Sequence, residues 1–413
     1  MRCFDLVTEE GTLNNATYPA AVGRGPIGPA WLTGSLVAEC LSQMLDRDLE
    51  LGRNVQATCC GTWDTAVIAG LDQRGEQPVP FLNIIMEPMA GGYGARPHAD
   101  GIDTGGLFCI PMGRIPDVEM TEFLYPVLTL WRREEPDSGG PGRHRGGVGA
   151  SVAITPHGTS LPMGLVLASA GKAVAQNAGL SGGHPGNSGL DVVARRSRVA
   201  ELLAAGTVPS TLAEVSDTCE IGQNYASSYL APGEVFAMTW QGGGGYGDPL
   251  YRDPAAVAAD LREEKITAAA ARDVYGVVLD GGEIDAAATA AERDHGRAAR
   301  RARSSVTGEP GTKVDAATGR RLDDNLVEVS EDGRTVIACR HCGERLGEPA
   351  ALRLGVHEGP STDAGPQMLA DPADYVDAPV VFRQYSCPGC WTAVYSAVVP
   401  ADHVDHVGGV AAR

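Results

Sequence analysis

The chain contains 413 residues, of which 43% are hydrophobic and 21% are charged, and its net charge is −19. This length and composition predict a globular protein of two or three domains and exclude a fibrous or disordered chain. The negative charge argues against nucleic acid or an anionic membrane surface as a partner, because both would repel the protein. We see no signal peptide and no apolar run of about 18 residues, so we expect no membrane span.

Glycine is unusually frequent, with 54 residues, and 27 prolines accompany it, whereas aromatic residues make up only 5% of the chain. This balance favours β-structure with many turns over a helical bundle. Apart from two CxxC pairs, the cysteines do not form the pattern of a secreted disulfide framework, so we expect a reducing, cytoplasmic location. These other cysteines are Cys3, Cys40, Cys59, Cys60, Cys109 and Cys219.

The N-terminal part of the chain begins with a turn-rich segment. A helix is predicted at 29–45, where Thr33 or Ser35 could provide the N-cap. Three segments rich in branched and apolar residues then predict strands. These segments are residues 62–73, 79–89 and 123–135.

Four glycine-rich loops lie among the strands in the first 250 residues. They occupy residues 90–106, 136–150, 177–189 and 239–249. Because short strands separate these loops, we expect an open or barrel-like β-architecture rather than a βαβ series.

The composition changes after residue 250. A helix is predicted from Pro254 to about Glu264, and a second, short helix begins near Thr267, which can cap it. Residues 283–303 predict a solvated helix whose acidic residues precede its arginines, as the helix dipole favours. Residues 304–321 show no hydrophobic period and are expected to be a linker.

The predicted fold class is α+β, with a β-rich glycine-loop domain, peripheral helices and a small C-terminal domain resembling a zinc ribbon. The expected divisions are the β-rich domain at 1–250, its helical extension at 251–303, the linker at 304–321 and the zinc-binding domain at 322–413.

The last of these domains carries the two CxxC pairs, Cys339 with Cys342 and Cys387 with Cys390. Each CxxC turn directs two thiolates at one ion, and two such turns complete the tetrahedral four-sulfur shell that zinc prefers. The alternatives are a redox-active pair or unrelated buried thiols, but a redox motif would need only one CxxC beside a βαβ unit. We therefore expect these four cysteines to hold a structural zinc ion.

The glycine loops allow two interpretations. Their amides could bind phosphate or carboxylate, although none matches the P-loop or dinucleotide-binding pattern, or they could be turns and close chain crossings. The first loop also carries Arg96, His98, Asp100 and Asp103. The histidine and carboxylates could bind a divalent cation, or arginine–aspartate pairs could clamp the loop.

Four motifs, in order, resemble the hydantoinase B/oxoprolinase family from residue 1 to about 300: "GGYGARPHADGIDTGG", "DSGGPGRHRGGVGA", "GLSGGHPGNSG" and "GGGGYGDPLYRDPAAVAADL". Their spacing is similar to the C-terminal half of the family's B-type subunit. Residues 322–413, with "CRHCGERLG" and "YSCPGCWTAV", are similar to the small zinc-binding subunit of acetone and acetophenone carboxylases.

This resemblance implies a heteromeric enzyme. In the family, an actin-like hydantoinase A-type subunit uses ATP to phosphorylate a carbonyl or lactam oxygen, and the B-type subunit handles the activated intermediate. The family's catalytic divalent metal is bound in the N-terminal half of the B-type subunit, which has no counterpart here. The resemblance therefore implies that partner chains supply the ATPase, that missing half and its metal.

The expected function is that of a subunit of an ATP-dependent ketone carboxylase, inactive alone. In this hypothesis Arg96, Asp100 and Asp103 shape or close the active site, and the zinc module docks subunits. One alternative is a complex that hydrolyses a cyclic amide, although the fused zinc module favours carboxylation. The other is a non-catalytic assembly subunit whose glycine loops serve only as turns.

Overall fold

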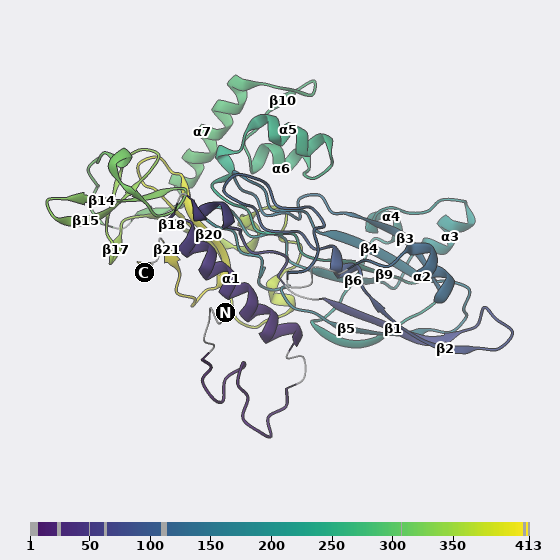
Figure 1. Cartoon of the computed structure of the whole chain (residues 1–413). Coiled ribbons are helices and arrows are strands. Elements are labelled where there is room, and N and C mark those ends of the chain that lie inside the picture. The colour runs from purple at the N-terminus through teal and green to yellow at the C-terminus, as the bar shows by residue number, and fades with distance from the viewer. Residues whose placement is uncertain are drawn as a thin grey trace.

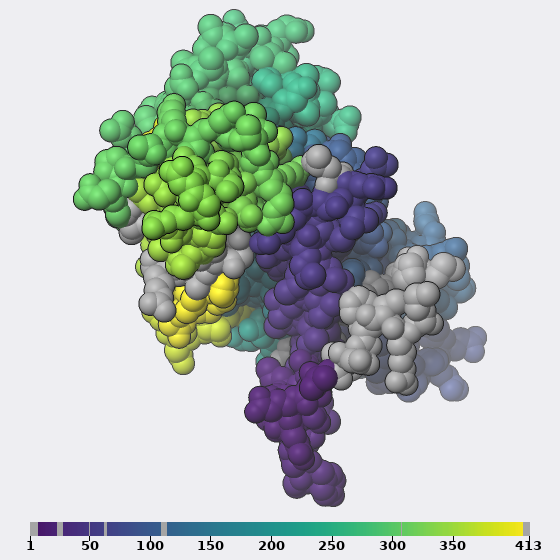
Figure 2. All heavy atoms as spheres, turned by 60° about the vertical axis from the view of Figure 1, so that its left-hand side comes forward, coloured from purple at the N-terminus to yellow at the C-terminus, as the bar shows by residue number. Residues whose placement is uncertain are grey.

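The computed structural model describes residues 7–22, 26–48, 50–61, 64–108, 114–306, 308–407 and 410–411, so Cys3 and Cys109 lie outside the described residues. A sandwich of two sheets lies at one end, the C-terminal β domain lies at the other, and long loops run between them (Figure 1). The N-terminal segment 7–22 projects away from the body (Figures 1 and 2). No helix in the described part of the chain combines the length and apolar character required to cross a membrane.

The sandwich consists of two antiparallel sheets. The first has the order β2 (Val79–Ile85), β1 (Thr65–Asp72), β5 (Met163–Ala168) and β8 (Tyr225–Leu230). The second has the order β3 (Val127–Glu134), β4 (Ala150–Pro156), β9 (Val235–Thr239), β6 (Leu190–Ala194) and β7 (Glu220–Ile221). The sheets are open and pack face to face. The predicted strands are therefore confirmed, and of the two expected arrangements, open or barrel-like, the described residues form the open one.

The main hydrophobic core lies between these sheets. Ile68 and Leu165 of the first sheet and Phe236 and Met238 of the second are fully buried in it. Every residue of β4 is buried, because its other face packs beneath α3 (Val199–Ala204) and α4 (Leu212–Val215). The alternating apolar residues of the strands thus produce a layered sandwich.

The predicted N-terminal helix is confirmed as α1 (Trp31–Leu45), but its predicted caps are wrong. The π-helical turn η1 (Pro26–Ala30) runs directly into α1, so Thr33 and Ser35 lie inside the helix. The Thr33 hydroxyl donates a hydrogen bond of 2.7 Å to the Pro29 carbonyl instead of capping an amide. Short helical elements that we did not predict are η2 (Leu51–Asn54), η3 (Glu87–Ala90) and α2 (Val118–Leu124).

Three helices after residue 250 follow the prediction. They are α5 (Pro254–Arg262), α6 (Ala268–Asp273) and α7 (Ala286–Arg303), with η4 (Pro249–Tyr251) before them and the β10–β11 hairpin (Leu279–Asp280, Glu283–Ile284) before α7. The Thr267 hydroxyl accepts a hydrogen bond from the Ala270 amide and caps α6, as expected. The expected solvated character of α7 holds over most of its length, but Arg300 is buried.

The C-terminal domain contains two further antiparallel sheets. One has the order β12 (Ser305–Val306), β18 (Gly355–Pro360), β19 (Val380–Ser386) and β20 (Ala393–Pro400). The other has the order β13 (Arg320–Arg321), β14 (Leu326–Glu331), β15 (Arg334–Cys339), β16 (Arg345–Glu348) and β17 (Ala351–Leu352). Smaller elements are η5 (Ala316–Thr318), η6 (Ser361–Ala364), η7 (Pro372–Asp374), β21 (His406–Val407) and β22 (Val410–Ala411).

The segment 304–321, expected to be a linker, is instead paired with this domain. Its first strand, β12, pairs with β18, and its last, β13, pairs with β14. Between them, the Val314 amide donates to the Gly343 carbonyl at 2.8 Å. Strands of two residues are too short to show the alternation of side chains by which a strand is recognised in a sequence.

The four glycine loops, residues 90–106, 136–150, 177–189 and 239–249, pack against one another, and we call them the glycine layer. The run Gly242–Gly245 is buried among the other three loops. The Gly243 amide donates to the Gly147 carbonyl at 2.8 Å, and a Cβ on Gly243 would lie only 2.1 Å from the Tyr93 carbonyl oxygen. The interpretation of these loops as close chain crossings is therefore confirmed.

Candidate metal centre and glycine-layer site

The two CxxC pairs occupy equivalent turns in two hairpins. Cys339 is the last residue of β15 and Cys342 lies in the turn to β16, whereas Cys387 and Cys390 lie in the turn between β19 and β20. Because the two hairpins belong to different sheets of the C-terminal domain, the cysteine cluster joins those sheets. Leu326, Ile337, Leu346, Tyr385 and Val394 pack around it, which gives this small domain a hydrophobic core.

The four sulfur atoms have the spacing of a tetrahedral metal site. The Sγ atoms of Cys339 and Cys390 are 3.7 Å apart, as are those of Cys342 and Cys387, and all ligand atoms lie within 4.8 Å of one another. A tetrahedral zinc ion with Zn–S bonds of about 2.3 Å requires sulfurs about 3.8 Å apart. The four cysteines therefore fit a structural zinc ion, and iron could use the same ligands.

The backbone of both turns is bent in the same way. The Gly343 amide donates to the Cys339 carbonyl at 2.9 Å, and the Trp391 amide donates to the Cys387 carbonyl at 2.8 Å. Both donors have positive φ, +72° for Gly343 and +59° for Trp391. A tryptophan in this left-handed region is uncommon. Gly355 makes room for its indole, because a Cβ there would lie 2.5 Å from the ring.

The C-terminal domain docks on the glycine layer through Asp248. The Asp248 carboxylate, 1% exposed, accepts two hydrogen bonds from Arg300 of α7, at 2.6 and 2.9 Å. It also accepts from the Ala393 amide at 2.8 Å, directly after the second cysteine turn. Burial alone would raise the pKa of Asp248, but the Arg300 charge and the hydrogen bonds outweigh burial and lower it.

The insertion between the two cysteine pairs also contacts the glycine layer. His184 is hydrogen-bonded through Nδ1 to the Ala364 carbonyl at 2.7 Å, and the Ser188 hydroxyl accepts from the Leu369 amide at 2.9 Å. Burial lowers the pKa of His184 to about 4. This histidine is therefore neutral at pH 7 and belongs to the interface between the two regions.

Asp100, one of the predicted site residues, is held by an arginine far along the chain. Arg252 forms two hydrogen bonds with the Asp100 carboxylate, at 2.6 and 2.7 Å, and a third, of 2.6 Å, with Asp260 of α5. The Asp100 carboxylate also accepts from the Arg145 amide at 2.7 Å. Burial opposes ionisation, but the hydrogen bonds and charge of Arg252 dominate and hold the pKa of Asp100 far below its usual range.

Asp103 has a similar environment. Arg145 donates to its carboxylate at 2.8 Å, the Val148 amide donates at 2.8 Å, and Lys265 lies 3.4 Å away. Burial raises the pKa of Asp103 less than the Arg145 hydrogen bond and charge lower it, so the net direction is downward. The sequence analysis did not identify the partners of these carboxylates, Arg145, Arg252 and Lys265. The two arginines lie in the quoted glycine motifs, and a permanently charged side chain in such a motif was the signal that could have identified them.

Arg96 and His98 lie outside this network. His98 is exposed and borders a hollow of about 440 Å³ with Asp48, Arg53 and Arg321. Arg96 is half-buried in a tight turn, and within the described ranges no carboxylate lies within ion-pair distance of its guanidinium. The structure therefore supports the clamp interpretation for Asp100, because an arginine, and not His98, binds its carboxylate.

A cleft of about 500 Å³ separates α1 from the C-terminal domain. Glu39, Asp46, Asp323 and Tyr395 are among its lining residues. Burial, reinforced by the nearby Asp46 carboxylate, raises the pKa of Asp323 to about 7. Burial likewise raises the pKa of Glu39 and of Asp46. Of these carboxyl groups, Asp323 therefore changes its charge near neutral pH.

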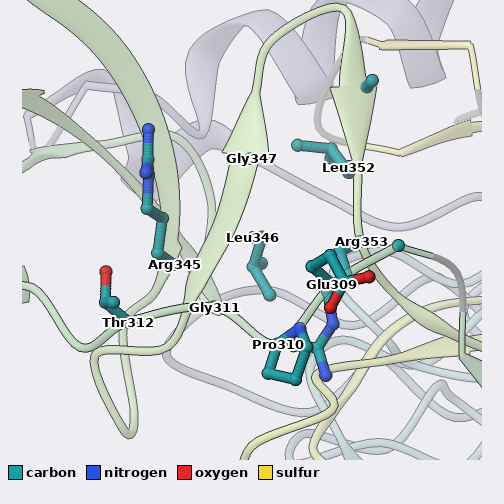
Figure 3. Close-up of a pocket in the computed structure, with 11 residues that line it drawn as sticks. Glu309, Pro310, Gly311, Thr312, Arg345, Leu346, Gly347, Leu352 and Arg353 are labelled. Atoms are coloured by element: carbon teal, nitrogen blue, oxygen red, sulfur yellow. The ribbon is translucent and has the colours of Figure 1, made fainter.

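A second hollow, of about 460 Å³, lies within the C-terminal domain, where residues 308–312 run beside β16 and β17 (Figure 3). Its two arginines are engaged. Arg353 donates to Glu344 at 2.7 Å, and Arg345 lies 3.5 Å from Glu331. Both positive charges are therefore balanced within the domain.

Comparison with known proteins identifies the family to which the N-terminal region, residues 1–249, is similar. The sequence profile of the hydantoinase B/oxoprolinase family matches residues 1–249. The chain is 32% identical over 231 residues to the acetophenone carboxylase delta subunit of Aromatoleum aromaticum. This alignment covers 52% of this chain and 32% of the relative. It is 32% identical over 303 residues to the caprolactamase subunit beta of Pseudomonas jessenii, covering 71% of this chain and 46% of the relative.

Two further similarities concern acetone carboxylase. The chain is 29% identical over 242 residues to the alpha subunit from Xanthobacter autotrophicus, covering 53% of this chain and 30% of that subunit. A nucleotide-free structure of acetone carboxylase superposes with a TM-score of 0.57 at 26% identity, covering 64% of this chain and 37% of that one. The chain thus spans less than half the length of these relatives. It belongs to the hydantoinase B/oxoprolinase family.

Proposed function

We propose that this chain is a subunit of a cytoplasmic, ATP-dependent ketone carboxylase. The observation that carries the proposal is the union, in one chain, of a hydantoinase B glycine layer with a four-cysteine domain docked on it through Asp248. Two of its relatives are named as subunits of acetophenone and acetone carboxylases. We propose zinc as the ion of the cysteine cluster.

The proposed complex divides the chemistry among chains. A hydantoinase A-like subunit would supply ATP-dependent activation, and a further chain would supply the N-terminal half of the B-type unit together with the catalytic divalent metal. The glycine layer supports this division, because its amides are used in hydrogen bonds to neighbouring loops. The names of two relatives, each a subunit of a carboxylase, support a complex of several chains.

Within this complex, we assign different roles to the three proposed site residues. Asp100 and Asp103 are positioning residues, because arginines engage both carboxylates. Arg145 fixes Asp103 to the second glycine loop, and Arg252, which follows the fourth loop, holds Asp100. Arg96 carries a charge that no carboxylate of the described residues neutralises, which suits an anionic enolate or carboxylated intermediate. Arg96 is therefore the residue that we propose to meet the reacting groups.

The alternative reaction is ATP-dependent opening of a cyclic amide. The similarity to the caprolactamase subunit favours it, since that alignment covers 71% of this chain, more than either carboxylase alignment. In this case the same subunits would activate a lactam oxygen, and water rather than a carboxyl donor would react.

The test is purification of the tagged full-length chain from its native host, with identification of partners by mass spectrometry and metal analysis. We expect an actin-like ATPase subunit, a chain with the remaining B-type segment, and about one zinc per copy. The purified complex should consume a ketone only with ATP and bicarbonate. Lactam opening without bicarbonate would favour the alternative, and recovery of the chain alone would overturn both enzymatic proposals.

A further inference from the structure

The cleft between α1 and the C-terminal domain has the dimensions of a small-molecule site. Its volume is about 500 Å³, and pockets for small molecules commonly measure about 300–1,000 Å³. Its lining comes from α1 and the turn after it, from residues 179–181 of the third glycine loop, and from the C-terminal domain. In Figures 1 and 2, α1 runs alongside that domain. A ligand in the cleft would therefore contact both regions of the molecule.

Two carboxyl groups line this cleft without a cationic partner. Glu39 belongs to α1, and Asp323 belongs to the turn between β13 and β14. Glu39 accepts a hydrogen bond from the Gln43 side chain at 3.2 Å, and Asp323 accepts from the Asn325 amide at 2.7 Å. In the part of the chain that the structure describes, no lysine or arginine lies within ion-pair distance of either carboxyl group. A carboxylate that is partly removed from water normally has such a partner.

The third carboxyl group of the cleft, that of Asp46, has the usual arrangement. It pairs with Arg321 at 2.7 Å. Glu39 instead lies near the C-terminal domain, where burial and the nearby carboxylates of Asp405 and Glu39 raise the pKa of the Tyr395 hydroxyl. The charge of Glu39 is thus directed at the cleft and is not compensated there.

Apolar side chains form another part of the cleft wall. Leu180, Leu322 and Val394 line it and are buried, and Met44 and the ring of Tyr395 lie beside them. Hydrocarbon gains free energy when it is buried against such a surface, and a tyrosine ring attracts cations. The cleft therefore complements a ligand that carries both positive charge and a hydrocarbon chain.

A metal ion fits this cleft less well than an organic cation does. Magnesium and calcium are surrounded by about six to eight oxygen atoms at about 2.0–2.6 Å, so their ligand atoms must lie close together. Among the described residues, only the four cysteines bring three or more potential ligand atoms of His, Cys, Asp or Glu within 4.8 Å of one another. Two ammonium groups joined by a hydrocarbon chain can instead meet the carboxyl groups of the cleft separately.

We propose that the cleft binds an aliphatic diamine, with one ammonium group at Glu39, the other at Asp323 and the methylene chain against Leu322 and Val394. Each ammonium group would donate a charge-assisted hydrogen bond to a carboxylate. The inference does not depend on the proposed function, because none of the three proposed site residues lines the cleft. A diamine bound there would also stabilise the contact between α1 and the C-terminal domain.

Binding should depend on pH through Asp323. Burial raises the pKa of this residue to about 7, and an ammonium group binds the carboxylate in preference to the neutral acid. The affinity should therefore fall as the pH falls through about 7. The charged and titratable groups around Asp323 are Asp324, Asp46 and Arg321, and the lining of the cleft adds Glu39, Arg47, Tyr395 and His406.

The experiment uses the full-length, metal-loaded chain with putrescine as the probe. Titration calorimetry at about pH 8, above the pKa of Asp323, measures the dissociation constant, and butylamine, which has one ammonium group, is the comparison. Glu39→Gln and Asp323→Asn each remove one charge from the cleft. Asp402→Asn is the matched control, because Asp402 is exposed and does not line the cleft. The melting temperature of each variant without ligand checks that it folds.

We expect saturable binding of putrescine, with an affinity at least about tenfold lower for butylamine and for each cleft variant. Asp402→Asn should bind putrescine like the wild type. Slower hydrogen exchange of α1 when putrescine is added to the wild type keeps the test independent of variant folding.

Three results would overturn the proposal. The first is no saturable binding of putrescine to the wild type. The second is equal affinity of the wild type and both cleft variants. The third is binding of magnesium, abolished by Glu39→Gln, in a chain that does not bind putrescine, which would indicate a metal site instead.

Discussion

The glycine layer and the cysteine domain are stabilised in opposite ways. In the glycine layer, backbone packs on backbone: Gly244, for example, lies so close to Ala178 that a Cβ would approach its carbonyl oxygen to 2.0 Å. In the cysteine domain, four side chains converge on one position from two hairpins. The first region depends on the absence of side chains, whereas the second depends on four side chains that are placed to hold one ion.

The two regions should therefore lose their structure independently of each other, except at the contacts that join them. Loss of the ion should release the C-terminal hairpins without opening the sandwich, since the sandwich has its own core. A change at Asp248 should affect both, because its carboxylate bonds to α7 and to the backbone after Cys390.

The largest effect is expected for Cys387→Ser. Structural zinc sites of this type contribute an apparent binding free energy of about 10–16 kcal/mol, which is also folding free energy. We expect the variant to lose its metal and residues 322–407 to unfold while the sandwich remains folded. Metal analysis and hydrogen exchange read by mass spectrometry measure both effects.

The control is Cys219→Ser, which removes a half-buried cysteine outside the cluster. This variant should keep the metal, and the C-terminal domain should stay protected from hydrogen exchange. If Cys387→Ser also retained both, the cluster would not be a structural metal site.

Asp248→Ala is the next largest change. It leaves Arg300, which is 8% exposed, as an uncompensated buried charge, and removal of one member of such a pair costs about 3–5 kcal/mol. Because the pKa of Asp248 is lowered in the folded state, its stabilisation is present above the unfolded pKa of about 3.9 and is lost as the pH falls through the folded value. The wild type should therefore lose stability on acidification more than the variant.

Thermal unfolding at several pH values measures the stability of the wild type and of Asp248→Ala. Arg320→Ala is the comparison, because its pair with Glu328 is exposed and should contribute about 0–1 kcal/mol. If the two substitutions lowered the stability equally, Asp248 would not be a main contact between the glycine layer and the C-terminal domain.

Gly243→Ala tests the glycine layer alone. The new Cβ would overlap the Tyr93 carbonyl, and forcing an extra group into a packed site costs about 1–3 kcal/mol. We expect a lower melting temperature with the metal retained. Gly75→Ala should be close to neutral, because the new Cβ would lie in an exposed turn at an ordinary contact distance of 3.8 Å from the Gln77 carbonyl oxygen. A similarly neutral Gly243→Ala would contradict a close chain crossing at Gly243.

The smallest effect is expected for Asp323→Asn in the cleft beside α1. The folded pKa of about 7 lies above the unfolded value of about 3.9, so the wild type loses stability as the pH rises between them. The amide can still accept from the Asn325 and Leu326 amides, which donate to the carboxylate at 2.7 and 2.8 Å. At pH 8 the variant should melt about 2–4 °C higher than the wild type, with no difference near pH 4.

Asp402→Asn, on the exposed surface, is the control and should not change the pH profile. A wild-type melting temperature that stays constant from pH 4 to 8 would contradict the raised pKa of Asp323.

The cysteine cluster could be predicted from the sequence because CxxC spacing is local and its chemistry is restricted. The glycine layer could not be placed in the same way, because its contacts join loops far apart in the chain. The partner of Asp100, for example, is Arg252, 152 positions later. The predicted caps of α1 were wrong because a π-helical turn precedes the helix. Residues 304–321 were predicted to be a linker because the strands they contain have only two residues each.

We propose that the chain contributes to catalysis in a complex and does not merely hold the complex together. The most direct test is turnover of the complex reconstituted with Arg96→Ala. We expect at least about a tenfold loss of ATP-dependent substrate consumption, with assembly and melting temperature unchanged. Unaltered turnover, or a loss that occurs only together with loss of assembly, would contradict it and favour a scaffold.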